Sequence, residues 1–268
     1  MQVKNCLVIG ADGLIGQFLI KDLKNLGYSI YGTSRRLEQI NKFSNLIYFD
    51  LNQGLLPNLN IELDFVIFSA GITSLDYCEK NIEISNEINI KKTIEIISYF
   101  LSKNIRVLFL SSNKVFDGAK SFCKYSDQTN PRTVYGIQKR KVEETCADSL
   151  FFSLRLTKVF TEEMQFLKKW RADVVLGKKI YAYKNEFFSP ITLSDVAGGI
   201  VKILKISETQ LLPTRNIYHL GNKIEISYFD FAKIYFRDNI KALSLLEPVY
   251  NFPSYRNNYN SLETHLPE

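Results

Sequence analysis

The chain has 268 residues, of which 46% are hydrophobic and 23% charged, and its net charge is +6 at pH 7. This is ordinary globular usage, and it excludes disordered, collagen-like and low-complexity chains. Lysine and arginine are scattered rather than striped, which argues against nucleic-acid binding. No apolar run reaches the roughly 18 residues of a membrane-spanning helix, and the N-terminus lacks the pattern of a secretory signal. We therefore expect a cytoplasmic protein that does not associate with membranes.

The cysteine pattern predicts neither disulfides nor a metal site. Cys6, Cys78, Cys123 and Cys146 are far apart and form no CxxC pair, and the chain has only two histidines. Because these residues have no zinc-ligand spacing, we expect isolated thiols in a reducing compartment and no bound metal.

Strand and helix patterns alternate through the first 155 residues. The apolar, β-branched runs that predict strands are Val3–Ile9, Tyr28–Gly32, Leu46–Phe49, Phe65–Ser69, Val107–Leu110 and Phe152–Leu156. Helical periodicity predicts helices from Leu14 to Gly27, from Ile82 to Ser102 and from Tyr135 to Ala147. This alternation is typical of an α/β protein with a doubly wound, parallel Rossmann sheet.

The alternation of strand and helix patterns becomes less regular after Leu156. A capping box at Thr192-Leu193-Ser194-Asp195 starts a helix that continues to Leu204. A short strand (Asn216–Leu220) and a helix (Ser227–Phe236) follow, and the polar tail from Pro248 is expected to be irregular.

These patterns predict two domains. Residues 1–155 form a dinucleotide-binding Rossmann domain, and residues 156–268 form a smaller C-terminal α/β region that binds substrate. We expect the ligand between them, with the loop of residues 118–131 as a cover.

A glycine turn follows the first predicted strand. Gly10 permits the tight turn, Gly13 lets the backbone approach a pyrophosphate, and Gly16 lets the helix pack closely on the strand. The phosphates then bind at the positive end of the helix, next to Leu14 and Ile15. The alternative is a tight turn with no ligand; the position and the flanking elements favour dinucleotide binding.

The end of the second strand indicates which dinucleotide binds. NAD sites usually place an acid there, whereas this chain has Ser34-Arg35-Arg36. Arginine forms charge-assisted bonds to a 2′-phosphate, so NADP is predicted, with NAD as the alternative and a solvated helix start as the reading without a ligand. Asp50 and Leu51 follow the third strand, where such folds contact adenine. Ser69, Ala70 and Gly71 follow the fourth strand and are expected to pass under the cofactor.

Tyr135 and Lys139 are four residues apart, so they lie on one face of a helix. A second such pair, Tyr99 and Lys103, lies late in a long helix, where a core tyrosine is the better interpretation. Tyr135 instead begins a helix and lies downstream of Ser112, which ends the fifth strand at the ligand-binding edge of the sheet.

At this point the chain resembles the extended short-chain dehydrogenase/reductase family, and within it the nucleotide-sugar reductases of the dTDP-4-dehydrorhamnose reductase type. The resemblance covers most of the chain. Beyond the glycine turn, it rests on the segments Ala70-Gly71-Ile72-Thr73, Ile88-Asn89-Ile90, Ser111-Ser112-Asn113-Lys114-Val115-Phe116-Asp117-Gly118, Pro131-Arg132-Thr133-Val134-Tyr135-Gly136-Ile137-Gln138-Lys139, Leu154-Arg155-Leu156 and His219-Leu220-Gly221.

The resemblance implies roles for four residues. Tyr135 is the general acid that protonates a carbonyl oxygen, and Lys139 lowers the pKa of Tyr135 and binds the nicotinamide ribose. Ser112 hydrogen-bonds the substrate oxygen, although a strand-end cap is its alternative reading. Asn89 supports Lys139 at the cofactor site.

Two departures from the family pattern fall in the substrate region. Asn113-Lys114 stands where many relatives have Asp-Tyr, and Lys158 stands where relatives often have an aromatic residue against the sugar. Thr73, Asn113 and Lys158 are therefore the expected substrate contacts. Lys158 would meet either the diphosphate of the nucleotide sugar or a carboxylated sugar.

The resemblance implies an NADPH-dependent oxidoreductase that reduces a keto group on a nucleotide-linked sugar for a surface polysaccharide. Two alternatives stay open: an epimerase or dehydratase that retains NAD, and a regulatory subunit that binds NADP without catalysis. Many relatives pair through the helices that correspond to Ile82–Ser102 and Tyr135–Ala147, so the resemblance allows a homodimer, and the oligomeric state stays open.

Overall fold

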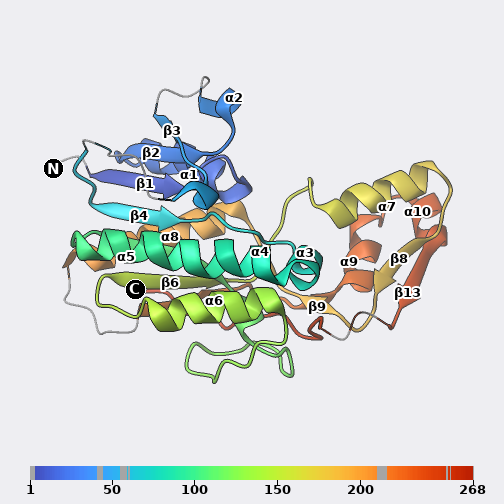
Figure 1. Cartoon of the computed structure of the whole chain (residues 1–268). Helices are drawn as coiled ribbons and strands as arrows, with labels where there is room; N and C mark the ends of the chain where they lie inside the picture. Colours follow the sequence, from blue (N-terminus) through green and yellow to red (C-terminus); the bar gives the residue numbers. More distant parts are fainter. Residues whose placement is uncertain are drawn as a thin grey trace.

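A seven-stranded parallel sheet forms the centre of the computed structural model (Figure 1), which describes residues 4–40, 45–54, 59, 61–209, 216–251, 253 and 255–267. The strand order is β3-β2-β1-β4-β5-β6-β11, and every neighbouring pair is parallel. The strands are β1 (Asn5–Ile9), β2 (Ser29–Ser34), β3 (Leu46–Tyr48), β4 (Phe65–Phe68), β5 (Arg106–Ser112), β6 (Phe151–Leu156) and β11 (Asn216–Leu220). The doubly wound sheet is thus confirmed, with strand ends shifted by one or two residues.

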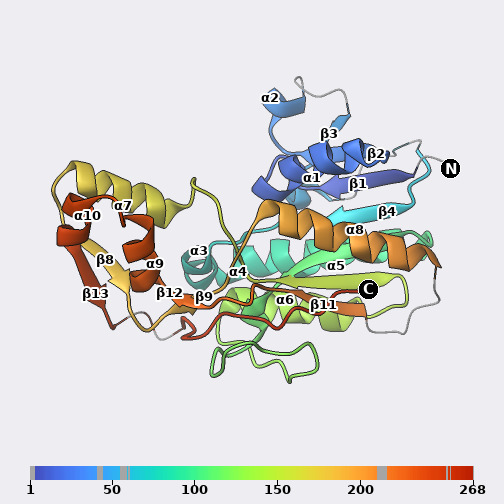
Figure 2. The ribbon, with the colours of Figure 1, turned by 180° about the vertical axis from the view of Figure 1, so that it is seen from behind.

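Helices cover both faces of the sheet (Figures 1 and 2). α1 (Leu14–Asn25) and α8 (Leu193–Thr209) lie on one face, and α5 (Thr93–Ser102) and α6 (Val134–Thr145) lie on the other. Side chains alternate between the faces of a strand. Cys6 and Val8 of β1 therefore join the core beneath α1 and α8. Leu7 and Ile9 join the core beneath α5 and α6. Both faces are therefore apolar, as expected for buried parallel strands.

The long predicted helix of residues 82–102 is divided into three parts. α4 (Ile82–Asn86) and α5 flank a π-helical segment, η2 (Glu87–Lys92), and the separate helix α3 (Leu75–Lys80) precedes α4. Short π-helical segments often mark functional sites. This one holds Asn89.

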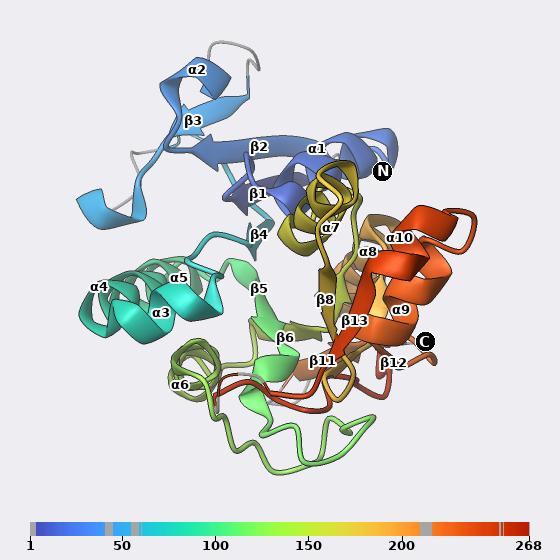
Figure 3. The same cartoon turned by 90° about the vertical axis from the view of Figure 1, so that its right-hand side faces the viewer.

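A second lobe lies beyond the carboxyl edge of the sheet (Figure 1), and Figure 3 shows it from the front. It contains α7 (Gln165–Val175), β8 (Ile180–Tyr183), α9 (Tyr228–Tyr235), α10 (Ile240–Leu245) and β13 (Leu246–Val249), around an aromatic core. The remaining short elements are α2 (Leu37–Ile40), η1 (Leu51–Gln53), η3 (Asn113–Val115), β7 (Lys158–Val159), β9 (Phe187–Phe188), β10 (Pro190–Ile191) and β12 (Ile226–Ser227). Residues 156–268 therefore form this lobe and also contribute α8 and β11 to the sheet layers, and the division at residue 155 stays a prediction.

The C-terminal tail returns from the lobe to the sheet. After β13 it has little regular structure, as predicted, but Asn257 and Asn260 are buried. It packs on the loop of residues 118–131, where Phe122 N donates to Ser261 Oγ. The tail, and not the loop, lines the cavity described below. Coverage of the ligand by the loop stays a prediction.

Within the described ranges, no helix has both the length and the apolar character that a membrane span requires. The same ranges contain no group of three His, Cys, Asp or Glu side chains placed to hold a metal ion. All four cysteines are free thiols and are buried.

Candidate functional site

Two cavities meet at the carboxyl edge of the sheet, where β1 and β4 lie side by side. The first has a volume of about 490 Å³ and lies over the ends of β1 and β2. The second has a volume of about 480 Å³ and lies between β5, α6 and the lobe. Gly13, Ser69 and Gly71 line both cavities. Neighbouring strands lead to opposite faces here, which is where ligands bind in doubly wound sheets.

The glycine turn forms a backbone cradle at the start of α1. Gly10 has φ +85°, and a Cβ there would lie 2.9 Å from the Ala70 backbone; a Cβ on Gly16 would overlap the Gly10 carbonyl oxygen. No side chain caps α1 at Gly13, and its first turn holds no acidic residue. The positive helix end is therefore open to an anion, as a bound dinucleotide pyrophosphate requires.

The predicted adenosine contacts line the first cavity. Ser34 is buried, and its Oγ accepts a hydrogen bond from the backbone N–H of Arg36 at 3.0 Å. Arg35 is exposed, and Arg36 Nε lies 2.6 Å from the Asp12 carboxylate. Asp50 Oδ1 accepts from Asn52 N at 3.0 Å and caps η1. The cavity wall around these side chains also includes Leu51 and Ala70.

Asn89 lines neither cavity, but it hydrogen-bonds to Ile72, which lines the first cavity. Its Oδ1 accepts from Ile72 N at 2.8 Å, and its Nδ2 donates to Ile72 O at 2.9 Å. The same Nδ2 donates to Gln138 Oε1 at 2.7 Å. Asn89 thus ties the loop after β4 to α6, and its predicted support of Lys139 at the cofactor site stays a prediction.

Tyr135 and Lys139 lie on adjacent turns of α6. Thr133 caps this helix, because its Oγ1 accepts from Gly136 N at 2.9 Å. Tyr135 lines the second cavity, whereas Lys139 lies behind it and donates from Nζ to Leu110 O at 2.8 Å. Lys139 Nζ is 5.6 Å from the centroid of the Tyr135 ring. The structure therefore places the pair together with only the phenol on the cavity wall.

Burial favours the neutral forms of both side chains. It raises the pKa of Tyr135, so the phenol is protonated at neutral pH. Burial also lowers the pKa of Lys139 to about 8, although Glu143 acts in the opposite direction. Lys139 is not among the groups that shift the pKa of Tyr135 in this structure. The lowering of that pKa by Lys139 therefore stays a prediction.

Ser112 ends β5 inside the second cavity. Its Oγ donates to Asn113 Oδ1 at 3.1 Å and accepts from Lys114 N at 3.2 Å. Asn113 Nδ2 in turn donates to Asn260 O at 2.8 Å. Thr73 and Lys158, the other two predicted substrate contacts, line the same cavity as Asn113. The structure thus brings Ser112, Tyr135 and all three predicted substrate contacts to one cavity.

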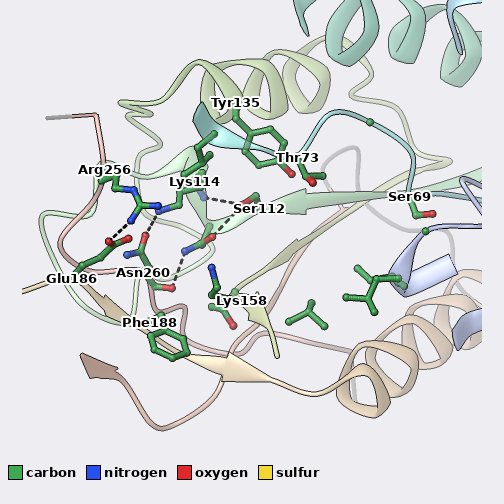
Figure 4. A pocket seen from close by; sticks show the side chains of 18 of the residues that line it. Ser69, Thr73, Ser112, Lys114, Tyr135, Lys158, Glu186, Phe188, Arg256 and Asn260 are labelled. Carbon is green, nitrogen blue, oxygen red and sulfur yellow. Dashed lines mark hydrogen bonds and ion pairs between the residues drawn. The ribbon is translucent and has the colours of Figure 1, made fainter. Parts of the chain in front are cut away.

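The same cavity holds residues that were not predicted as site residues. They are Leu75, Lys114, Thr157, Val159, Glu186, Phe188, Tyr228, Arg256 and Asn260. Figure 4 shows Lys114, Arg256 and Asn260 at one end of the cavity and Ser69 at the other. Lys114 could have been predicted from the sequence, because it belongs to the Asn113-Lys114 departure from the family pattern. The tail residues carry none, because they reach the site only through the fold.

Comparison with known proteins agrees with this arrangement. The family model described as RmlD substrate binding domain matches residues 4–265. The chain is 26% identical over 238 residues to the spore coat polysaccharide biosynthesis protein SpsK of Bacillus subtilis, with 84% of this chain and 76% of that protein covered. It is 24% identical over 248 residues to a dTDP-4-dehydrorhamnose reductase of Aggregatibacter actinomycetemcomitans, with 91% and 81% covered.

A solved structure shares the fold. The crystal structure of dTDP-4-dehydrorhamnose reductase from Bacillus anthracis, in complex with NADP, superposes with a TM-score of 0.78 at 21% identity. The superposition covers 98% of this chain and 90% of that chain. Because the family model spans residues 4–265, the chain belongs to the RmlD substrate binding domain family.

Proposed function

We propose that the protein is an NADPH-dependent oxidoreductase that reduces a keto group on a nucleotide-linked sugar. One observation carries this proposal: Ser112 and Tyr135 line a cavity that adjoins the glycine-turn cavity and shares Gly13, Ser69 and Gly71 with it. The relatives named dTDP-4-dehydrorhamnose reductase support the same reaction class.

The first cavity fits the adenosine end of NADPH. The open N-terminus of α1 binds the pyrophosphate, and Gly10, Gly13 and Gly16 let the backbone approach it. Ser34 and Arg35 then face the 2′-phosphate, with Arg36 beside them. NADPH, when bound, supplies a hydride to the carbonyl carbon of the substrate.

The residues of the second cavity handle the proton. The phenol of Tyr135 donates its proton to the carbonyl oxygen, and the raised pKa of Tyr135 keeps that proton in place before reaction. The Ser112 hydroxyl donates a hydrogen bond to the same oxygen and orients it. Lys139 supports the phenol from behind. The carbonyl gains one hydride and one proton, which gives an alcohol and NADP⁺.

Substituting Tyr135 tests this assignment. The wild type is expected to consume NADPH with at least one member of a panel of 4-keto nucleotide sugars, and Tyr135→Phe is expected to lose about 100-fold or more in kcat. Tyr99→Phe removes a phenol from the other Tyr–Lys pair, on the solvent-exposed side of α5, and is expected to keep wild-type turnover. Equal turnover by wild type and Tyr135→Phe contradicts the acid role.

The same assay separates the two alternatives. An epimerase or dehydratase would copurify with tightly held NAD and would not oxidise added NADPH. A regulatory subunit would bind NADPH and reduce no member of the panel. Arg35 and Arg36 at the adenosine end favour NADPH over retained NAD.

We also propose that the enzyme works in the cytoplasm as a homodimer. Ile82, Ile84 and Ile137 are about half exposed on α4 and α6, which correspond to the pairing helices of many relatives. Burial of such side chains favours association. Light scattering is expected to give twice the 31.0 kDa chain mass, and a monomer at micromolar concentration would contradict the dimer.

A further inference from the structure

The second cavity carries a surplus of positive charge. Lys114, Lys158 and Arg256 line it, and Glu186 is the one carboxylate among the described residues on its wall. Glu186 is already paired, because its Oε2 lies 2.8 Å from Arg256 Nη1. The two lysines therefore face the cavity without a carboxylate of their own, and a net charge of about +2 is available to a ligand.

Lys114 is tied to the residue that is proposed to hold the carbonyl. Its backbone N–H donates to Ser112 Oγ, and its Nζ donates to the neutral amide oxygen of Asn260. Burial lowers the pKa of Lys114 to about 8; Glu186 raises it, and Lys158 and Arg256 lower it further. The protein thus keeps a cation in a partly buried place where a bound anion would stabilise it.

Lys158 lies on the facing wall. Its Nζ is 5.5 Å from the centroid of the Phe166 ring and 5.6 Å from that of Tyr228, so aromatic faces rather than carboxylates surround it. Next to it, Thr157 Oγ1 is buried and has no hydrogen-bond partner among the described residues. Buried hydroxyls normally have partners. A polar ligand in the cavity would supply one.

We propose that the keto sugar bound here carries a carboxylate, and that Lys114 and Lys158 bind it. This inference rests on the proposed function, because the carbonyl at Ser112 and Tyr135 fixes where the sugar ring lies. Ser112 caps η3, the turn that contains Lys114, so we expect an anion held by Lys114 to belong to the ring that carries the carbonyl. A carboxylate there receives charge-assisted hydrogen bonds from two ammonium groups.

A matched pair of ligands tests the inference by calorimetry on the NADP⁺-loaded protein. UDP-glucuronate and UDP-glucose share the nucleotide and the diphosphate and differ at C6, and the corresponding dTDP compounds form a second pair. We expect the uronate to bind about tenfold or more tightly than its neutral partner in at least one pair. Equal affinities, or no detectable binding of either uronate, would overturn the proposal.

Three variants locate the effect. In Lys114→Met the ratio of the two affinities is expected to fall about threefold or more, because only Lys158 then remains to bind the carboxylate. In Lys114→Arg, which keeps the charge, the preference is expected to persist. Lys202→Met removes a lysine from the exposed side of α8 and is expected to keep the wild-type ratio. If Lys114→Met weakens both members of a pair equally, and weakens UDP or dTDP alone, the lysine binds the diphosphate and the inference fails.

Failure of this inference is distinguishable from failure of the proposed function. A protein that reduces neutral keto sugars with no uronate preference keeps the function and loses the inference. A protein that prefers uronates but reduces no keto sugar loses the function alone. NADP⁺ binding by each variant confirms that it is folded.

Discussion

Lys139 places an ammonium group in the interior, and this has a consequence for stability. Burial lowers its pKa to about 8 from the ordinary value of 10.5. Between these pH values the unfolded chain binds the proton and the folded chain does not, so stability increases with pH. Relative to Lys139→Met, the wild type is expected to gain about 1.4 kcal/mol for each pH unit in this window.

Urea unfolding of wild type and Lys139→Met between pH 7 and pH 10 measures this difference. The raised pKa values of Cys6 and Cys146 act in the opposite direction, but both proteins contain these cysteines, so their contribution cancels. Lys114 is likewise common to both. Parallel curves of unfolding free energy against pH would show that Lys139 titrates normally in the fold.

Residue patterns predict some of the site and miss the rest for a physical reason. The glycines at 10, 13 and 16, and the Tyr135–Lys139 pair, are local signals, because each is set by a turn or by one helix. Asn260 belongs to the site through a hydrogen bond that spans 147 residues. No local pattern encodes such a contact, and the tail that provides it has the composition of an irregular segment.

At the scale of elements, a buried ion pair joins α6 to β6. Arg155 Nη2 lies 2.7 Å from Glu143 Oε2, and Ser153 Oγ donates to Glu143 Oε1 at 2.9 Å. Loss of one partner leaves the other charge buried and unpaired. Glu143→Gln is therefore expected to lower the free energy of unfolding by about 3–5 kcal/mol.

The adjacent glutamate is the control. Glu144 lies 2.6 Å from Arg140 in an exposed pair on the same helix, and such pairs contribute about 0.3–0.5 kcal/mol. Glu144→Gln is expected to stay within about 0.5 kcal/mol of wild type in urea unfolding. Similar losses in the two variants would show that helix propensity, and not the buried pair, sets the effect.

Element boundaries show where periodicity stops being informative. Hydrophobic spacing places the strands and the helical stretch of residues 82–102 correctly, because each buries an apolar face. It does not reveal the π-helical turn at Glu87–Lys92. That turn coincides with the bonds that Asn89 makes to Ile72 and Gln138, and these tertiary contacts have no signature in the spacing.

On the scale of the whole molecule, the tail connects the lobe, the sheet and the second cavity. Asn257 Nδ2 donates to Phe116 O at 2.9 Å, and Asn260 Nδ2 donates to Phe187 O at 2.8 Å. Buried asparagines are stable when their amides are bonded in this way. The polar composition that predicts an irregular tail therefore also supplies the bonds that fix it against the fold.

The tail packs so closely on Gly221 that a larger side chain at this position would displace it. A Cβ at Gly221 would overlap the Leu262 carbonyl oxygen, so Gly221→Ala displaces the segment that carries Asn260 and loosens the support of Lys114. The KM for the keto sugar is expected to rise about fivefold or more, while the Kd for NADPH changes less than about twofold, because the glycine turn lies at the other end of the site. Gly198→Ala, which meets no atom within 4 Å, is expected to change neither constant. An equal loss of NADPH affinity in Gly221→Ala would mean that the tail supports the whole fold rather than the substrate cavity.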